Sequence, residues 1–199
     1  MPDVLLGQAY YLRFDPKLWR ASQPYAPLGT LYAASFLRER GHRVAIFDAM
    51  LAGSVSEWRT ALARQRPRLA VIYEDSFNYL SKMCLLRMRE AALEMIDAAR
   101  ALDCPVVVSG SDPTDHPEAY LSRGAAAVIM GEGEATLAEI ADRIKLGQPL
   151  CDVVGAAVLD ANGAIVRSPA RPFIKSLEDR KSTRLNSSHI QKSRMPSSA

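Results

Sequence analysis

The chain has 199 residues, of which 48% are hydrophobic and 24% are charged, a composition typical of a globular protein with a substantial core. No apolar run approaches the length of a membrane-spanning helix, so we expect no membrane partner. The formal net charge of +3 comes from residues 180–199, which hold five basic and no acidic residues, and the remaining 20 basic and 22 acidic residues favour no nucleic acid partner.

Short apolar runs and helical patterns alternate through the first three quarters of the chain. The apolar runs have the length of buried strands and lie at residues 4–7, 43–47, 69–73, 105–108 and 126–130. Apolar residues at helical spacing predict helices at residues 29–40, 54–66, 82–102, 117–122 and 136–145. A loop over residues 10–27 precedes the first helix. These five β–α units predict an α/β fold, a flavodoxin-like doubly wound five-stranded parallel sheet.

The spacing of the apolar residues changes after the last predicted helix. Apolar residues alternate with others over residues 153–159, and Asn162-Gly163 has the pattern of a two-residue turn. We therefore expect a C-terminal β-hairpin appended to the sheet.

The composition changes again after Asp179. The string that follows is rich in serine and basic residues and poor in apolar ones, so it lacks the burial that offsets the entropy of ordering. It also resembles translated sequencing-adapter read-through, and we expect it to be a disordered, non-native tail. The chain then divides into an α/β domain (1–150), a hairpin with a linker (151–178) and the tail (179–199).

Three cysteines, Cys84, Cys104 and Cys151, are too widely spaced for the usual zinc or iron–sulfur cluster patterns. We therefore expect no metal-ligand set within this chain. An odd number of cysteines without a secretory leader favours the reducing cytoplasm.

In an open parallel sheet, ligands bind at the carboxyl ends of the strands, near the point where the strand order reverses. Glycines in the loops at that edge permit close approach by a ligand, although tight strand-to-helix turns would also explain them. The loops predicted there are residues 8–27, 48–53, 74–81, 110–116 and 131–135.

Two phosphate-handling classes share this architecture but need different loops. Gly131-Glu132-Gly133 lacks the third glycine of a dinucleotide-binding loop, and its glutamate would repel a pyrophosphate. A phosphorylated receiver domain needs an acidic pair after the first strand and a lysine after the fifth, and the sequence supplies neither, although Asp75 follows the third strand. We therefore disfavour both classes.

Three motifs together resemble one family. Pro27-Leu28-Gly29 opens the first helix, Gly131-Glu132-Gly133-Glu134 follows the fifth strand, and Arg171-Pro172-Phe173-Ile174 follows the hairpin. With these motifs, and over about residues 3–178, the chain resembles the N-terminal cobalamin (B12)-binding domain of B12-dependent radical S-adenosylmethionine (SAM) enzymes.

The resemblance implies that the chain is a fragment of a longer enzyme and that its own cofactor is cobalamin. SAM and a [4Fe–4S] cluster would belong to a radical SAM barrel in the missing C-terminal part, which would be the intramolecular partner of this domain. The full enzyme would catalyse a methyl transfer, a cyclisation or a rearrangement. We expect this chain alone to lack SAM-cleaving activity, because its cysteines do not match the cluster motif.

The resemblance also implies which residues contact cobalamin. Asp48, Met50 and Gly53 would form the loop beneath the corrin, with Met50 in place of the cobalt-ligating histidine of the D-x-H-x-x-G motif in methionine-synthase-type domains. Because a thioether is a weak ligand of oxidised cobalt, we expect base-off cobalamin without a protein histidine ligand. The nucleotide tail would contact Ser76, Gly110, Ser111, Gly131, Glu132 and Gly133.

Two motifs depart from those of methionine-synthase-type domains. The S-x-L after the third strand is reduced to Ser76, and the paired glycines after the fourth strand are reduced to Gly110 followed by Ser111. These departures favour an alternative hypothesis, a non-enzymatic α/β ligand-binding or interaction module that has lost cobalamin.

Overall fold

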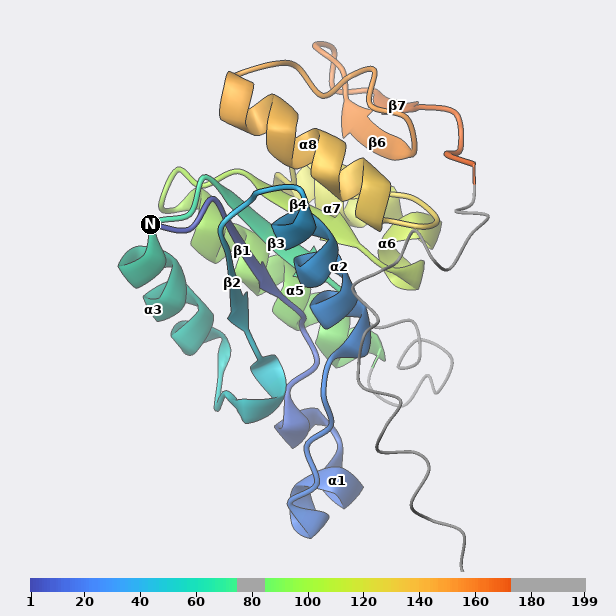
Figure 1. Ribbon diagram of the computed structural model, residues 1–199. Coiled ribbons are helices and arrows are strands. Elements are labelled where there is room, and N and C mark those ends of the chain that lie inside the picture. The colour runs from blue at the N-terminus through green and yellow to red at the C-terminus, as the bar shows by residue number, and fades with distance from the viewer. Residues whose placement is uncertain (75–84, 173–199) are drawn as a thin grey trace, which may run out of the picture.

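The computed structural model describes residues 1–74 and 85–172, which form a seven-stranded sheet covered by helices on both faces (Figure 1). The strand order is β2-β1-β3-β4-β5-β6-β7. The first five strands are parallel and the last two antiparallel. The strands are β1 (Val4–Gly7), β2 (Val44–Phe47), β3 (Leu69–Tyr73), β4 (Val106–Ser109), β5 (Ala127–Ile129), β6 (Ala156–Leu159) and β7 (Ile165–Arg167). The parallel part has the flavodoxin-like order 2-1-3-4-5, which confirms the predicted fold class.

Two layers of helices cover the sheet. One face is covered by α2 (Leu28–Glu39) and α8 (Glu134–Leu146). The other face is covered by α3 (Val55–Gln65), α5 (Leu85–Arg100) and α7 (Pro117–Arg123). Short elements follow the carboxyl ends of three strands: η1 (Leu12–Phe14), α1 (Pro16–Ala21), η2 (Ala49–Leu51) and α6 (Ser111–Asp115). Of these, α1 extends away from the sheet (Figure 1).

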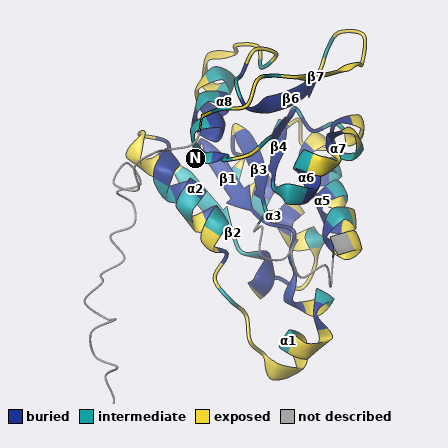
Figure 2. Cartoon of the chain, turned by 90° about the vertical axis from the view of Figure 1, so that its right-hand side faces the viewer, coloured by how far each residue is buried: buried dark blue, intermediate teal, exposed yellow. Residues whose placement is uncertain are grey.

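Side chains that alternate along the strands build a core on each side of the sheet. Leu5 and Ile72 pack among the residues of α3 and α5, whereas Leu6 and Val71 pack among those of α2 and α8. All four are buried, and the central strands lie covered between the layers in Figure 2. Because both faces of each strand are covered, the strands read in the sequence as continuous apolar runs rather than as alternating ones.

The predicted strands and helices of the α/β region are found with small shifts at their ends, except that the start of the helix predicted at residues 82–102 lies outside the described residues. Two regions differ from the expectation. The predicted loop at residues 10–27 contains η1 and α1. The Asp15 side chain accepts hydrogen bonds from the amides of Lys17 and Leu18 in the first turn of α1. Residues 111–115, predicted as a loop, form α6. Helices of one or two turns are too short to show an apolar period.

The C-terminal hairpin belongs to the main sheet, because β6 pairs antiparallel with β5, with Val128 opposite Ala157. Its turn is also longer than predicted. The Asp160 amide donates to the Ala164 carbonyl at 2.8 Å, and this hydrogen bond encloses residues 161–163. The Asp160 carboxylate accepts from two amides of the turn, which stabilises this geometry. The prediction of a two-residue turn at Asn162-Gly163 is therefore wrong.

The division of the chain after residue 150 falls within this continuous sheet. The predicted tail, residues 179–199, lies outside the described residues, so its disorder stays a prediction. Within the two described ranges, no helix combines the length and the apolar character needed to cross a bilayer.

Candidate functional site

The carboxyl edge of the parallel strands gathers the loops that were predicted to carry function. Since β1 lies between β2 and β3, the strand order reverses at the β1–β3 pair. The chain after β1 leads to α2 on one face, and α5, which follows β3 in sequence, lies on the other. Ligands of doubly wound folds bind at such a point. Ser76 and Asp75, in the loop after β3, lie outside the described residues.

Glu74 joins three of these loops and was not singled out in the sequence. Its Oε1 accepts a hydrogen bond from the Ala9 amide at 2.9 Å, and its own amide donates to the Ser109 carbonyl at 2.8 Å. Its Cβ lies 2.7 Å from the position that a Cβ on Gly110 would occupy. The only sequence signal was its place directly after a buried strand.

The loop after β2 is held by its own polar groups. The Asp48 carboxylate accepts from the Met50 amide at 3.0 Å and from the Gln8 side chain. Burial raises the pKa of Asp48 above its ordinary value, against the opposing effect of these two hydrogen bonds. Gln8 in turn accepts from the Tyr10 amide at 2.5 Å. Asp48 therefore shapes the loop through contacts within the protein.

Met50 does not face solvent at this edge. Its side chain is only 2% exposed and packs with Tyr10, Leu12 and Met88. Its neighbour Leu51 is 73% exposed. The structure therefore changes which side chain of the loop is available to a ligand, from Met50 to Leu51.

Gly53 ends this loop and borders a cavity of about 440 Å³. Its amide donates to Glu57 Oε1 at 2.6 Å. The cavity lies between η1 and the first turns of α3 and α5, and it is lined by aromatic and charged side chains that include Tyr11 and Arg87. The Tyr11 hydroxyl is buried without a hydrogen-bond partner among the described residues. Its pKa is raised mainly by burial and secondarily by the negative charge of the nearby Glu74.

Gly110 and Ser111 connect β4 to α6. Gly110 has φ +150°, and the close approach of Glu74 leaves no room for a side chain there. The Gly110 carbonyl accepts from both the amide and the hydroxyl of Thr114, at 3.1 and 2.7 Å. The backbone at this predicted contact is therefore tightly fixed.

The three residues of the loop after β5 differ in what they offer. Gly131 has φ +74°, is exposed, and has open space where a Cβ would point. Gly133 is buried, and a Cβ there would lie 2.7 Å from the Tyr73 hydroxyl. Glu132 is half-buried between them. A ligand can approach the backbone at Gly131, whereas packing within the protein already accounts for glycine at position 133.

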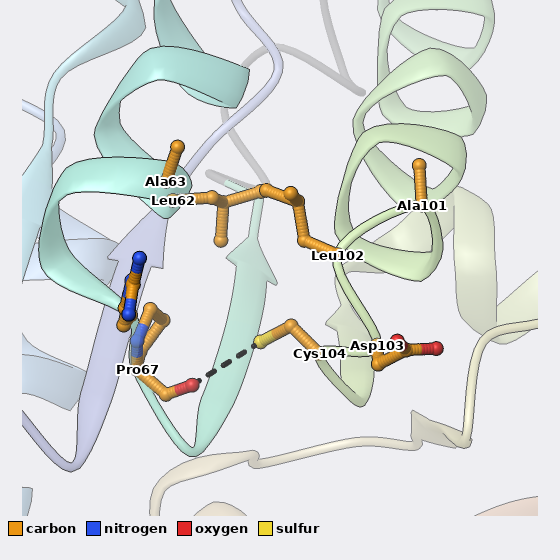
Figure 3. Close-up of a pocket in the computed structure, with 8 residues that line it drawn as sticks. Leu62, Ala63, Pro67, Ala101, Leu102, Asp103 and Cys104 are labelled. Carbon is orange, nitrogen blue, oxygen red and sulfur yellow. Dashed lines mark hydrogen bonds between the residues drawn. The ribbon is translucent and has the colours of Figure 1, made fainter.

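A second cavity, of about 470 Å³, lies at the opposite edge of the sheet, between the carboxyl ends of α3 and α5 (Figure 3). The Cys104 thiol points toward Pro67 and donates to its carbonyl at 3.5 Å. Burial raises the pKa of this thiol to about 11. The thiol is therefore neutral near pH 7, which makes it a poor nucleophile and a poor metal ligand.

Within residues 1–74 and 85–172, no group of three or more His, Cys, Asp and Glu side chains is arranged to hold a metal ion. Of the predicted contact residues described, Asp48, Gly53, Gly110, Ser111 and the loop after β5 all lie at the carboxyl edge. Their contacts with cobalamin stay predictions.

Comparison with known proteins gives the chain a family. The model of the B12 binding domain matches residues 20–141, more than half of the chain. An uncharacterised methyltransferase of Pyrococcus horikoshii, PH0819, is 26% identical over 156 residues, which are 77% of this chain and 32% of that protein. The chain therefore spans about a third of the length of this curated relative.

Two solved enzymes share the fold. The radical SAM methyltransferase TsrM of Kitasatospora setae superimposes with a TM-score of 0.60 and 23% identity, over 83% of this chain and 30% of TsrM. The cobalamin-dependent SAM radical enzyme OxsB, solved with aqua-cobalamin and SAM, gives a TM-score of 0.68 and 19% identity, over 87% of this chain and 23% of OxsB. By the extent of the family match, this chain belongs to the B12-binding domain family.

Proposed function

We propose that the chain binds cobalamin over the carboxyl edge of β1–β5 and is the cobalamin-binding domain of a longer radical SAM enzyme. The observation that carries this proposal is the family match over residues 20–141, because that stretch contains the loops after β2, β3, β4 and β5. The fold shared with TsrM and OxsB, both solved with cobalamin, supports the same conclusion.

The residues at the edge fit such a cofactor. A corrin has a broad apolar face and a rim of amide groups that need hydrogen-bond partners. Leu51 offers an exposed apolar side chain after β2, and Gly131 offers an exposed backbone with open space where a Cβ would point. Gly110 and Ser111 lie two strands from β1, on the side toward β5, where the nucleotide tail would reach them.

The loop after β2 supplies no nitrogen ligand for cobalt. Met50 is buried, Leu51 has no donor atom, and the Asp48 carboxylate is engaged within the loop. We therefore propose that cobalamin binds base-off without a protein ligand below the cobalt. Its dimethylbenzimidazole tail then lies toward the loops after β3, β4 and β5. The cofactor supplies a cobalt centre that can carry a methyl group, and the domain's residues bind and orient it.

The activity of the whole protein belongs to this proposal as well. The match covers 32% of the methyltransferase relative, 30% of TsrM and 23% of OxsB. SAM and a [4Fe–4S] cluster would bind in a radical SAM barrel joined through the linker, and the reaction would be a methyl transfer, a cyclisation or a rearrangement. The free thiols of Cys104 and Cys151 favour a reducing, cytoplasmic location.

Cobalamin titration tests the proposal against a non-enzymatic module that has lost the cofactor. The purified chain is mixed with cob(II)alamin without oxygen, passed through a gel-filtration column and examined by ultraviolet–visible absorption. We expect stoichiometric co-elution and the spectrum of the base-off form. If free cobalamin separates completely from the protein, the alternative is correct.

A second assay tests whether this chain can cleave SAM without the proposed radical SAM barrel. After anaerobic reconstitution with iron and sulfide, the chain is incubated with SAM and a reductant. We expect no 5′-deoxyadenosine above a protein-free control, because the cluster motif is absent. Product that depends on the chain would overturn this part of the proposal.

A further inference from the structure

A buried carboxylate connects three helices beside the proposed cofactor edge. Asp112 of α6 is 6% exposed. Arg89 of α5 donates to both of its oxygens, from Nε to Oδ2 at 2.8 Å and from Nη2 to Oδ1. The Tyr120 hydroxyl of α7 donates to Oδ2 at 2.5 Å. These three residues are here called the Asp112 cluster.

The Asp112 cluster is better explained by the geometry that it fixes than by the stability that it adds. Burial by itself would raise the pKa of Asp112, but the hydrogen bonds from Arg89 and Tyr120 outweigh it, and the net pKa lies below the ordinary value. The carboxylate is therefore ionised at neutral pH. Buried ion pairs are often no more stabilising than apolar side chains of similar volume, because desolvation offsets the attraction. What the cluster does supply is geometric specificity, since the bidentate pair between Arg89 and Asp112 restricts how α5 lies against α6.

Short stretches of chain connect the Asp112 cluster to the carboxyl edge of the sheet. Asp112 lies two residues after Gly110, and the Gly110 carbonyl is held by Thr114 of the same short helix. The backbone of Gly110 packs on Glu74 at the end of β3. Arg89 belongs to the first turns of α5, the helix that follows the loop after β3. The cluster therefore connects α5 and α7 to α6, the short helix that begins directly after Gly110.

The geometry points to the Asp112 cluster as a positioning device that holds Gly110 and Ser111, in the loop after β4, in the arrangement that receives the nucleotide tail of cobalamin. This inference rests on the proposed function. Asp112 is a positioning residue, because its oxygens are occupied by Arg89 and Tyr120 and the residue is almost fully buried. Its loss should weaken cobalamin binding even where the fold is intact.

The chain offers a matched control. Arg123 of α7 pairs with Asp97 of α5 through Nε, at 2.9 and 3.0 Å. This exposed pair joins the same two helices, α5 and α7, but it lies near their carboxyl ends, away from Gly110. If weaker cobalamin binding came only from loosening α5 against α7, it should therefore appear in variants of the Asp112 cluster and in variants of the Asp97–Arg123 pair alike.

The test measures the dissociation constant of cobalamin and urea unfolding for wild type, Asp112→Asn, Tyr120→Phe and the control Asp97→Asn. We expect about tenfold weaker binding for Asp112→Asn, consistent with the loss of one charge-assisted hydrogen bond. Tyr120→Phe should weaken binding less, and Asp97→Asn should leave it unchanged. Amide hydrogen exchange at Ser111 and Thr114 should accelerate in Asp112→Asn and not in Asp97→Asn.

A triple variant separates positioning from stability. Arg89→Met/Asp112→Leu/Tyr120→Phe replaces the cluster with apolar side chains and should regain stability relative to Asp112→Asn. We expect its cobalamin binding to stay about tenfold weaker than that of wild type. Recovery of binding together with stability would overturn the inference. If the triple variant does not fold, Tyr120→Phe, which removes a single oxygen atom, decides in the same way: unchanged binding and exchange would overturn it.

The two proposals fail differently. Wild-type protein that binds no cobalamin contradicts the proposed function itself. Wild-type protein that binds, together with a folded Asp112→Asn variant of equal affinity, contradicts only the positioning role.

Discussion

The backbone amide of Ala9 donates a 2.9 Å hydrogen bond to Glu74 Oε1, and this bond crosses the point where the strand order reverses. It ties the loop after β1 to the residue that follows β3. Since the Glu74 amide also donates to Ser109 at the end of β4, one residue sets the relative positions of three loops at the proposed cofactor edge.

Replacement of Glu74 should therefore affect both stability and binding. Glu74→Ala removes the acceptor of the Ala9 amide and is expected to lower the free energy of unfolding by about 1–3 kcal/mol, with weaker cobalamin binding. Glu74→Gln is the matched control, because it keeps an oxygen at this position, and its losses should be smaller. Urea unfolding and cobalamin titration measure the two effects. Equal losses in both variants would assign the effect to the charge of Glu74 and not to its hydrogen bond.

Gly131→Ala and Gly147→Ala form a matched pair that isolates backbone approach by the ligand. The two glycines have φ of +74° and +67°, and neither has an atom within 4 Å of its Cβ position. Each alanine should therefore cost about 1 kcal/mol of stability through backbone strain alone. Gly147 lies at the far end of α8, so only Gly131→Ala should weaken cobalamin binding. Parallel titrations of the two variants check this, and equal affinities would show that the ligand does not approach Gly131.

Histidine substitutions after β2 test cobalt coordination. Wild-type protein with cob(II)alamin should show no nitrogen superhyperfine triplet in electron paramagnetic resonance, because the loop has no nitrogen ligand. Because Met50 stands at the position of the cobalt-ligating histidine, the sequence alone predicts that Met50→His would create the triplet. Because Met50 is buried and Leu51 is exposed, we now expect the triplet from Leu51→His and not from Met50→His. A triplet in wild type would refute base-off binding without a protein ligand, and a triplet in Met50→His alone would refute the revised placement.

The acid stability of the fold should depend on Asp3. Its carboxylate accepts from the Arg43 side chain at 3.0 and 3.2 Å and from the Arg43 amide at 3.0 Å. These bonds hold the pKa of Asp3 well below its usual range. A carboxyl with a lowered folded pKa stabilises the protein above its unfolded pKa, about 3.9, and this contribution is lost as the pH falls toward the folded pKa.

Asp3→Asn should accordingly be less stable than wild type at pH 7, by about 1 kcal/mol, because Arg43 is largely exposed. The difference should shrink below about pH 4. Urea unfolding of both proteins at pH 7 and pH 3 gives the comparison. A difference that stays constant with pH would mean that ionisation of Asp3 is not the cause.

The sequence by itself determined the order of the elements and the edge at which to look for function. A run such as Leu69–Tyr73 is apolar without interruption because both of its faces are buried, and that requirement is visible in the residues themselves. Gly110 and Gly131 could also be singled out, since positive φ is a local demand that glycine meets.

Only the tertiary structure decided where individual side chains of the site point. Met50 is buried because Tyr10, Leu12 and Met88, distant in sequence, enclose it, and no local pattern shows this. The hairpin joins the sheet because β5 leaves an edge open to β6. Asp112 finds Arg89 and Tyr120 only once α5, α6 and α7 have packed. Local conformational preferences depend on neighbouring residues and can be predicted from them, whereas these contacts depend on which distant segments the packed core brings together.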